Sequence, residues 1–287
     1  MQDIACIILT KDEALHIERC IRSAQQVCRD IWVIDSYSQD KTCQLAERLG
    51  AHVVQHPFTY QAEQFNWAID TLPIHNAWIW RLDADEIISE HLAQLVDAQL
   101  PTWADSINGV YVNKQIVFMG HALKHGGWYP APQIKIVRRG CGRSEDKLMD
   151  EHLVVLGGET VYCDGDQTDW NLHDIDWWWQ KHLGYVQREA RNMLAMEQQQ
   201  LGATEGEAVQ ARLWGTNAER KRWMKRVYAH CPLYVRPVIY FLFRYIVLGG
   251  WLDGYAGWYW HTRQGLYYRL LVDRELSKLR KEQHNKT

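Results

Sequence analysis

The chain has 287 residues, of which 47% are hydrophobic and 23% are charged. This composition excludes a disordered protein, and the length allows one large domain or two smaller ones. Seven cysteines at irregular spacings, with no Cys-x-x-Cys pair, argue for free thiols in a reducing compartment and against a zinc site. The first residues contain no basic region and only a short apolar run, so we expect no secretory signal and a cytosolic protein.

The net charge of −3 conceals two parts of opposite sign. Residues 211–287 contain 15 Lys and Arg against 5 Asp and Glu, which leaves 17 and 30 in residues 1–210. The basic part is also rich in aromatic residues, a combination that suits nucleic acid or the headgroup layer of a membrane. Its most apolar segment, 237–252, is interrupted by Arg244 and is shorter than the roughly 20 residues that span a bilayer.

This pattern favours a membrane surface over nucleic acid and over a membrane span. We therefore expect residues 211–287 to support membrane association, and salt to weaken that contact. The other interpretation is that the aromatic residues pack a helical region onto the protein core.

The first hundred residues alternate short apolar runs with helical patterns. Strands are expected at 4–9, 31–34, 51–55 and 77–80, and helices at 14–26 and 42–49. This β-α-β-α-β order predicts a parallel sheet with right-handed crossovers, in which ligands bind at the carboxyl ends of the strands.

Polar clusters follow three of these strands, at 10–13, 35–36 and 83–85. Because the carboxyl ends of parallel strands share one edge of a sheet, we expect a single crevice to receive all three. Asp83 and Asp85 point the same way if their segment is extended, and carboxylate oxygens are ligands of Mg²⁺ and Mn²⁺. The alternative is a solvated Asp-rich turn. Neither of the common glycine-rich phosphate-binding loops is present, so a metal would have to replace them.

Three segments, 7–13, 33–42 and 81–86, resemble the opening of family 2 glycosyltransferases, which are inverting enzymes of the GT-A fold. More narrowly, 64–68, 125–130 and 149–152 resemble the branch that contains bacterial lipopolysaccharide-core β-1,4-glucosyltransferases. The resemblance covers about residues 4–190, and 244–245 and 252–254 are more loosely similar. It implies an α/β fold with a Rossmann-like, mostly parallel sheet flanked by helices, and a C-terminal helical, aromatic and basic region that associates with a membrane.

The resemblance also implies roles for individual residues. The positions that match donor-nucleotide contacts are Thr10, Glu13, Asp35, Asn66 and Asp83. Asp83 and Asp85 match the metal motif, with Asp85 as the direct ligand of a Mn²⁺ or Mg²⁺ that neutralises the departing diphosphate. Asn66 alone remains of the Ala-Arg-Asn that many members have at this position.

Asp150 and Glu151 match the acidic pair that supplies the general base of the family, and Glu151 is favoured. A surface ion-pair cluster is the other interpretation of this pair. Gly127 and Trp128 are expected to contact the acceptor or the sugar, since glycine permits close approach and tryptophan offers a face for stacking. A tight turn with a core tryptophan is equally compatible.

Two histidine patterns in the chain are possible metal ligands by residue type. His173 either completes the coordination of the metal or is a structural histidine. His121 and His125 have metal-like spacing, but the glycines around them argue against the helix that would align the pair.

The run of tryptophans at 177–179 opens a helix that is expected to reach Arg191. Residues 193–207 are polar and Gln-rich, which predicts a mobile connection between domains. We therefore expect a catalytic domain at 1–205 and a helical region at 206–287 that packs on this domain and on the membrane surface.

The resemblance predicts an inverting, metal-dependent transferase that moves a hexose, glucose-type favoured, from a nucleoside-diphosphate sugar, UDP favoured. The acceptor would be a glycan or glycolipid at the cytosolic membrane face, in envelope polysaccharide or lipopolysaccharide assembly. One rival is a sugar nucleotidyltransferase, whose Gly-rich opening loop with Arg and Lys is missing here. The other is a non-catalytic, membrane-associated sugar-binding protein.

Overall fold

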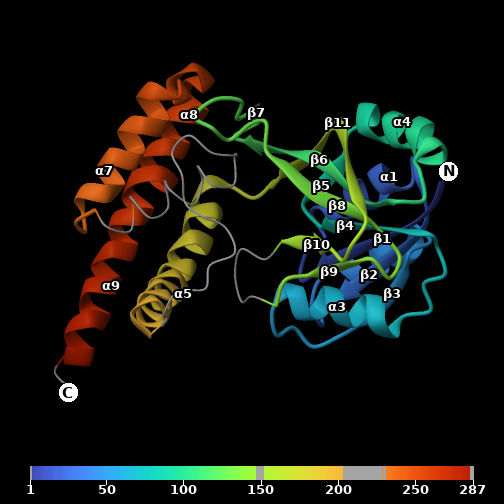
Figure 1. Cartoon of the computed structure of the whole chain (residues 1–287), viewed down its shortest axis with the longest axis horizontal. Coiled ribbons are helices and arrows are strands. Elements are labelled where there is room, and N and C mark those ends of the chain that lie inside the picture. The colour runs from blue at the N-terminus through green and yellow to red at the C-terminus, as the bar shows by residue number, and fades with distance from the viewer. Residues whose placement is uncertain (1, 147–151, 203–227, 229–230, 285–287) are drawn as a thin grey trace. The chain divides into compact units, whose positions relative to one another are not determined.

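The computed structural model describes residues 2–146, 152–202, 228 and 231–284 (Figure 1). They form two compact units. The first contains Met1–Lys124 and Trp128–Leu172, and the second contains His125–Gly127 and His173–Thr287. The predicted domain boundary at 205 lies outside the described residues and stays a prediction. All seven cysteines are free, as their spacing predicted.

The first unit is a sheet with helices on both faces. Its strands are β1 (Gln2–Thr10), β2 (Cys28–Asp35), β3 (His52–Gln55), β4 (Trp78–Asp83), β5 (Glu86–Ile88), β6 (Ile107–Phe118), β7 (His121–Ala122), β8 (Pro132–Arg138), β9 (Gly142–Ser144), β10 (Leu153–Val155) and β11 (Glu159–Trp170). Its helices are α1 (Ile17–Ala24), α2 (Thr42–Arg48), α3 (Gln61–Thr71), α4 (Glu90–Gln99) and the 3-10 turn η1 (Leu100–Thr102).

The main sheet has the strand order β3-β2-β1-β4-β8-β6-β11-β5, with β7 paired to β6. The first four strands are parallel, as the sequence predicted. Beyond them β8 runs antiparallel to β4 and β6, β11 is parallel to β6, and β5 is antiparallel to β11. The predicted α/β fold is therefore confirmed, with a parallel half that continues into a mixed half. A separate antiparallel pair is formed by β9 and β10.

Burial of both faces explains why β1 is apolar throughout. Ile4, Cys6 and Ile8 belong to the core cluster shared with α1, α2 and α4, whereas Ile7 and Leu9 belong to the cluster shared with α3. Alternate side chains of a strand point to opposite faces, so a strand covered on both sides reads as a continuous apolar run. Each fully buried isoleucine stabilises the fold by roughly 1.5–3 kcal/mol.

Two local expectations were wrong. Ala84 and Asp85 form a two-residue turn between β4 and β5, so the segment is not extended and strand alternation does not align Asp83 with Asp85. The Gln-rich segment expected to be a connection is helical as far as Gly202. Gln, Met, Glu and Leu are good helix formers, so polarity alone was a poor sign of a loop there.

The second unit is helical, which confirms a C-terminal helical region. Its elements are α5 (Ile175–Gly202), α7 (Val235–Leu242), the π-helix η2 (Phe243–Val247), the 3-10 turn η3 (Gly250–Asp253), α8 (Gly254–Trp260), the π-helix η4 (His261–Tyr267) and α9 (Tyr268–His284). Val186 and Ala190 of α5 pack against Tyr268, Val272 and Leu276 of α9. Among the described helices, no single one is long and apolar enough to cross a membrane, although a pair bent by 72°, Val235–Val247 with Gly250–Gln283, passes by length and composition.

Candidate active site

The three polar clusters meet at the carboxyl edge of the parallel strands. Thr10 is paired in register with Asp35 across β1 and β2, and Leu9 is paired with Asp83 across β1 and β4. Neighbouring strands lie roughly 5 Å apart. The structure therefore brings together Thr10, Asp35 and Asp83, three of the residues predicted to bind the donor.

Two buried polar atoms at this edge have no hydrogen-bond partner among the described residues. They are Thr10 Oγ1 and Asp83 Oδ1. Buried polar atoms are nearly always paired, because an unpaired one costs about 1–3 kcal/mol. Two orphaned oxygens at the carboxyl ends of neighbouring strands indicate a site that is completed by a ligand.

The loops after β1 and β2 are joined by hydrogen bonds. Lys11 Nζ donates to the carbonyl of Tyr37 at 2.5 Å, and the amide of Asp12 donates to Ser38 Oγ at 2.7 Å. Asp12 and Tyr37 both have positive φ, at 53° and 59°. Non-glycine residues seldom adopt this conformation, and it is frequent at ligand sites. Tyr37 is also 47% exposed, and sequence reasoning gave it no role.

Asp35 is fully buried and already has protein partners. Its Oδ2 accepts the amide of Ser38 at 2.8 Å and Nε2 of Gln55 at 3.4 Å, and its Oδ1 accepts the hydroxyl of Ser38. Burial, followed by a hydrogen bond to Asp35, raises the pKa of Cys43 to about 11. Asp35 thus shapes the loop after β2, and its predicted contact with a nucleotide stays a prediction.

The turn after β4 presents two carboxylates. The pKa of Asp83 is raised, first by burial and then by the charge of Glu86. Asp85 Oδ2 accepts a hydrogen bond from Asn171 Nδ2 at 3.2 Å, and the carbonyl of Asp85 accepts the amide of Trp170 at 3.0 Å. The turn is therefore anchored to the end of β11.

Beneath this turn lies a buried charge cluster that the sequence analysis missed. Glu86 is fully buried, and both of its carboxylate oxygens lie 3.0 Å from Lys135 Nζ. It also accepts the amide of Asp83 at 3.0 Å and Nε2 of Gln167 at 2.5 Å. Burial alone would raise the pKa of Glu86, but Lys135 and then Lys114 outweigh it and lower this pKa to about 2. Glu86 is therefore a charged support of the turn.

Asp83 and Asp85 fit a divalent cation. Mg²⁺ and Mn²⁺ prefer carboxylate oxygens, and the unpaired Asp83 Oδ1 is an acceptor that lacks a donor in the described structure. A nearby cation would also relieve the repulsion that Asp83 experiences from Glu86.

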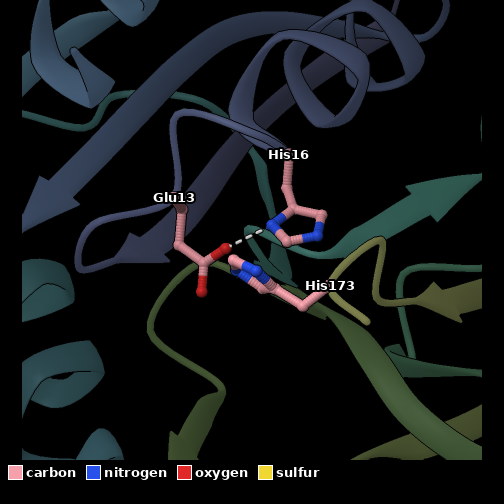
Figure 2. A group of neighbouring side chains, drawn as sticks. All are labelled: Glu13, His16 and His173. Carbon is pink, nitrogen blue, oxygen red and sulfur yellow. Dashed lines mark hydrogen bonds and ion pairs between the residues drawn. The ribbon is translucent and has the colours of Figure 1, made fainter. Parts of the chain in front are cut away.

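Glu13 and His16 form a hydrogen-bonded pair. His16 Nδ1 lies 2.5 Å from Glu13 Oε2 (Figure 2), and its Nε2 accepts the amide of Leu172 at 2.9 Å. Both nitrogens of this buried ring have protein partners. His173, the next residue of the chain, begins the second unit and stacks on Trp177 at 3.9 Å between ring centroids. A metal role for His173 stays a prediction.

Asn66 joins α3 to β9. Its Nδ2 donates to the carbonyl of Ser144 at 3.0 Å, and its Oδ1 accepts the amide of Ser144 at 2.9 Å. Asn66 also lines an open groove of about 520 Å³ with Tyr60, Glu63 and Arg143. Its amide is thus occupied by the backbone of β9, and its predicted contact with the donor stays a prediction.

Gly127 and its neighbour Gly126 allow close approach by protein side chains. Both have positive φ, at 74° and 69°. A Cβ at Gly126 would lie 2.3 Å from His261 Nε2, and a Cβ at Gly127 would lie 3.3 Å from Arg244 Nη2, all within the second unit. Glycine is therefore explained at both positions without a ligand. The predicted sugar contacts of Gly127 and Trp128 stay predictions.

A polar row on β6 and β11 also escaped the sequence analysis. Asp166 accepts hydrogen bonds from Tyr129 Oη at 3.0 Å and Gln115 Nε2 at 3.2 Å, and Asp164 lies 3.4 Å from Asn113 Nδ2. Asp166 and Asn113 are register partners. The only signal in the sequence was the alternation of polar residues along each strand.

The predicted bases, Asp150 and Glu151, lie outside the described residues. The nearest described strands in the sequence are β9, which ends at Ser144, and β10, which begins at Leu153.

Comparison with known proteins supports the reading of this edge. Residues 5–139 match the family model described as glycosyl transferase family 2. A protein of Rickettsia bellii described as an uncharacterized glycosyltransferase is 40% identical over 94 residues, which cover 33% of this chain and 31% of that protein. A Rickettsia felis protein of the same description is 37% identical over 97 residues, or 34% of each chain. The chain thus spans about a third of the length of the curated relatives it matches.

Solved structures show a weaker likeness. Glucosyl-3-phosphoglycerate synthase of Mycobacterium tuberculosis, in complex with Mn²⁺, UDP and glucosyl-3-phosphoglycerate, aligns with 22% identity over 39% of this chain and 43% of that chain, at a TM-score of 0.33. The same enzyme in complex with phosphoglyceric acid aligns with 16% identity over 60% of this chain and 73% of that chain, at 0.41. The matched residues 5–139 hold β1 to β8 and the whole carboxyl edge with Thr10, Asp35 and Asp83. This part of the chain is therefore similar to glycosyl transferase family 2 domains, and its sheet with helices on both faces is an α/β fold.

Proposed function

We propose that the protein transfers a hexose from a nucleoside-diphosphate sugar to a hydroxyl group of a glycan or glycolipid, with inversion at the anomeric carbon. The observation that carries this proposal is the pair of orphaned oxygens, Thr10 Oγ1 and Asp83 Oδ1, at the carboxyl edge of a domain similar to those of family 2. A diphosphate-bearing donor with its cation would supply the missing partners there.

Different residues of this edge would bind different parts of the donor. Asp83 and Asp85 would hold a Mn²⁺ or Mg²⁺, which when bound offsets the charge of the departing diphosphate. Thr10 Oγ1 donates to a donor oxygen, and the interlocked loops after β1 and β2 enclose the nucleotide. Tyr37 projects its ring at this edge with 47% exposure, which suits stacking on a nucleobase.

The acceptor needs a base and a surface that recognises hydroxyl groups. Glu151, with Asp150 as the second choice, removes the proton of the attacking hydroxyl. The polar row of Asn113, Gln115 and Asp166 offers the amide and carboxylate groups that hydrogen-bond sugar hydroxyls. A UDP-glucose-type donor and a setting in envelope or lipopolysaccharide assembly, at the inner membrane face, complete this proposal.

The substitution Asp83→Asn distinguishes a metal-binding role of Asp83 from a structural role. The substitution keeps the shape of the side chain but removes a buried charge that has no described partner on Oδ1. We therefore expect the metal-free variant to be at least as stable as the wild type. Mn²⁺ together with a nucleoside diphosphate should raise the Tm of the wild type but not that of the variant. Asp105→Ala, which removes an exposed carboxylate, is the matched control and should respond like the wild type.

Turnover is then measured with a panel of nucleotide sugars, in Mn²⁺, in Mg²⁺ and in chelator. Asp85→Ala should lose metal-dependent donor binding, whereas Glu151→Gln should keep donor binding and lose transfer. Binding of no nucleotide sugar under any metal condition would refute the transferase proposal and favour the non-catalytic sugar-binding alternative. Formation of a nucleotide sugar from a sugar phosphate and a nucleoside triphosphate would favour the nucleotidyltransferase.

A further inference from the structure

The helix α7 and the π-helix η2 carry their apolar residues on the outside. Val235, Val238, Ile239, Leu242 and Ile246 recur at spacings of three and four residues, and each is at least 42% exposed. In a helix of a globular protein such a stripe faces the core.

The opposite side of the same helices carries the polar and charged groups. Arg236 Nε donates to Asp273 Oδ1 at 2.8 Å, and both side chains are only 1% exposed. Arg244 Nε donates to the carbonyl of Gly126 at 2.5 Å, and its Nη1 donates to the hydroxyl of Tyr240. The amphipathic pattern is thus inverted, with charged side chains inside and aliphatic side chains outside.

Exposed apolar residues continue along the chain through η3 and α8, where aromatic residues replace aliphatic ones. Trp251, Tyr255 and Trp258 are 54%, 64% and 45% exposed. Of the 22 large hydrophobic side chains exposed in the described chain, 13 lie within residues 234–258. Contiguous apolar patches of this kind are rare on soluble monomers and mark a contact surface.

The charges of this segment favour lipid as the occupant. Residues 234–260 contain only three charged side chains, Arg236, Arg244 and Asp253. Asp253 is 4% exposed and lies 2.6 Å from His125 Nδ1. All three are therefore turned inward and bound within the unit. A hydrocarbon layer tolerates no unpaired charge, and tryptophan and tyrosine prefer the headgroup level, so the uncharged face with its aromatic end is complementary to a bilayer.

We propose that the face formed by α7, η2, η3 and α8 inserts into one leaflet of a lipid bilayer. The helical run Val235–Val247 is about 20 Å long at 1.5 Å per residue, which is less than the roughly 30 Å of the hydrocarbon core. The chain then turns at Gly249, which has a positive φ of 71°. The aliphatic stripe enters the acyl chains, while Trp251, Tyr255 and Trp258 lie at the headgroups.

This mode of binding differs from the electrostatic contact that the sequence predicted. Arg236 and Arg244 are engaged inside the unit, so the apolar side chains drive insertion and salt has little effect on it. Flotation with vesicles tests this difference. We expect the full-length protein to bind vesicles of phosphatidylcholine alone, and to stay bound in high salt.

Ile246→Lys, at a side chain that is 58% exposed, should weaken vesicle binding by at least about tenfold. Phe58→Lys, at a 55% exposed side chain of the first unit, is the matched control and should bind like the wild type. Circular dichroism of both variants verifies that they are folded. Ile246 is not part of the sheet that carries Thr10, Asp35 and Asp83, so insertion and sugar transfer can fail independently.

Three results would overturn the proposal. Binding that requires phosphatidylglycerol and is lost in high salt would indicate a purely electrostatic contact. Absence of vesicle binding, together with self-association that Ile246→Lys abolishes, would make a second copy of the chain the occupant. Labelling of Val247→Cys by an impermeant thiol reagent sealed inside the vesicles would show that the chain crosses the bilayer.

Discussion

Lys135→Met tests whether the buried charges support the turn that carries Asp83 and Asp85. Lys135 Nζ lies 3.0 Å from both carboxylate oxygens of the fully buried Glu86. At an effective dielectric constant of about 20, an ion pair at this distance contributes roughly 5 kcal/mol, which offsets the desolvation of both charges. Removing one partner leaves a buried charge, so we expect the free energy of unfolding to fall by roughly 3 to 5 kcal/mol. Lys114, 3.6 Å from Glu86, keeps the loss near the lower value.

The same substitution changes the response to acid. The pKa of Glu86 is lowered from 4.5 to about 2, because Lys135 and Lys114 outweigh the effect of burial. The stability that Glu86 contributes is therefore complete above pH 4.5 and is lost as the pH falls toward 2. Without Lys135 the pKa of Glu86 rises, and acid unfolding should begin at a higher pH than in the wild type.

Urea unfolding at neutral pH, followed by tryptophan fluorescence, measures the effect. Trp80 Nε1 donates to Gln167 Oε1 at 2.8 Å, so a fluorophore lies within the cluster. Lys41→Met, at an exposed lysine, is the control. Adding Glu86→Gln to Lys135→Met should recover part of the loss, because no charge is then left unpaired. An unfolding free energy within about 0.5 kcal/mol of the wild type, with an unchanged acid midpoint, would refute the reasoning.

Four further substitutions test packing and charge elsewhere. Gly165→Ala brings a Cβ to 2.8 Å from the backbone of Leu92 and should lower the free energy of unfolding in urea by about 1–3 kcal/mol. In Gly184→Ala the new Cβ meets open space in α5, so this substitution should raise the free energy of unfolding by about 0.5–1 kcal/mol. Equal effects of the two substitutions would contradict this account. Arg236→Met leaves the buried Asp273 without its cationic partner and should lower the free energy of unfolding by roughly 3–5 kcal/mol. A loss below about 1 kcal/mol would show that the pair is dispensable. Burial, then Arg244, lowers the pKa of His261 from 6.5 to about 4, so its stability contribution is complete above pH 6.5 and is lost toward pH 4. His261→Gln should therefore flatten the dependence of Tm on pH in this window, and an unaltered slope would exclude His261 as its source.

Much of the parallel half of the sheet could be predicted from local pattern. The runs around Ile4, Ile31 and Trp78 are short, apolar and bounded by polar clusters, so both the strands and their carboxyl ends were evident. The mixed half was not predicted. Its strands β6 and β11 are each 12 residues long and carry polar side chains that bind one another across the sheet, a pairing that no local periodicity reveals.

The sequence predicted which residues lie at the carboxyl edge, but not the partners that these residues have in the structure. Asp83 and Asp85 stood out because they follow an apolar strand, yet their turn and the orphaned Asp83 Oδ1 depend on partners far away in sequence. Glu86, directly beside them, received no role because its cations, Lys114 and Lys135, lie on other strands. The basic and aromatic character of residues 211–287 predicts membrane association, which stays a prediction, although two of its arginines, Arg236 and Arg244, are bound inside the second unit.

The amide of Asn66 has a consequence for solubility. The hairpin of β9 and β10 has only two strands, so the outer edge of β9 would present an unpaired amide and carbonyl at Ser144. Exposed strand edges of this kind are templates on which another chain can add a strand. The side-chain amide of Asn66 forms hydrogen bonds with both of these backbone groups of Ser144, as a residue of a neighbouring strand would. The helix α3 thereby closes an edge that would otherwise invite intermolecular β-sheet, and protects the hairpin from aggregation.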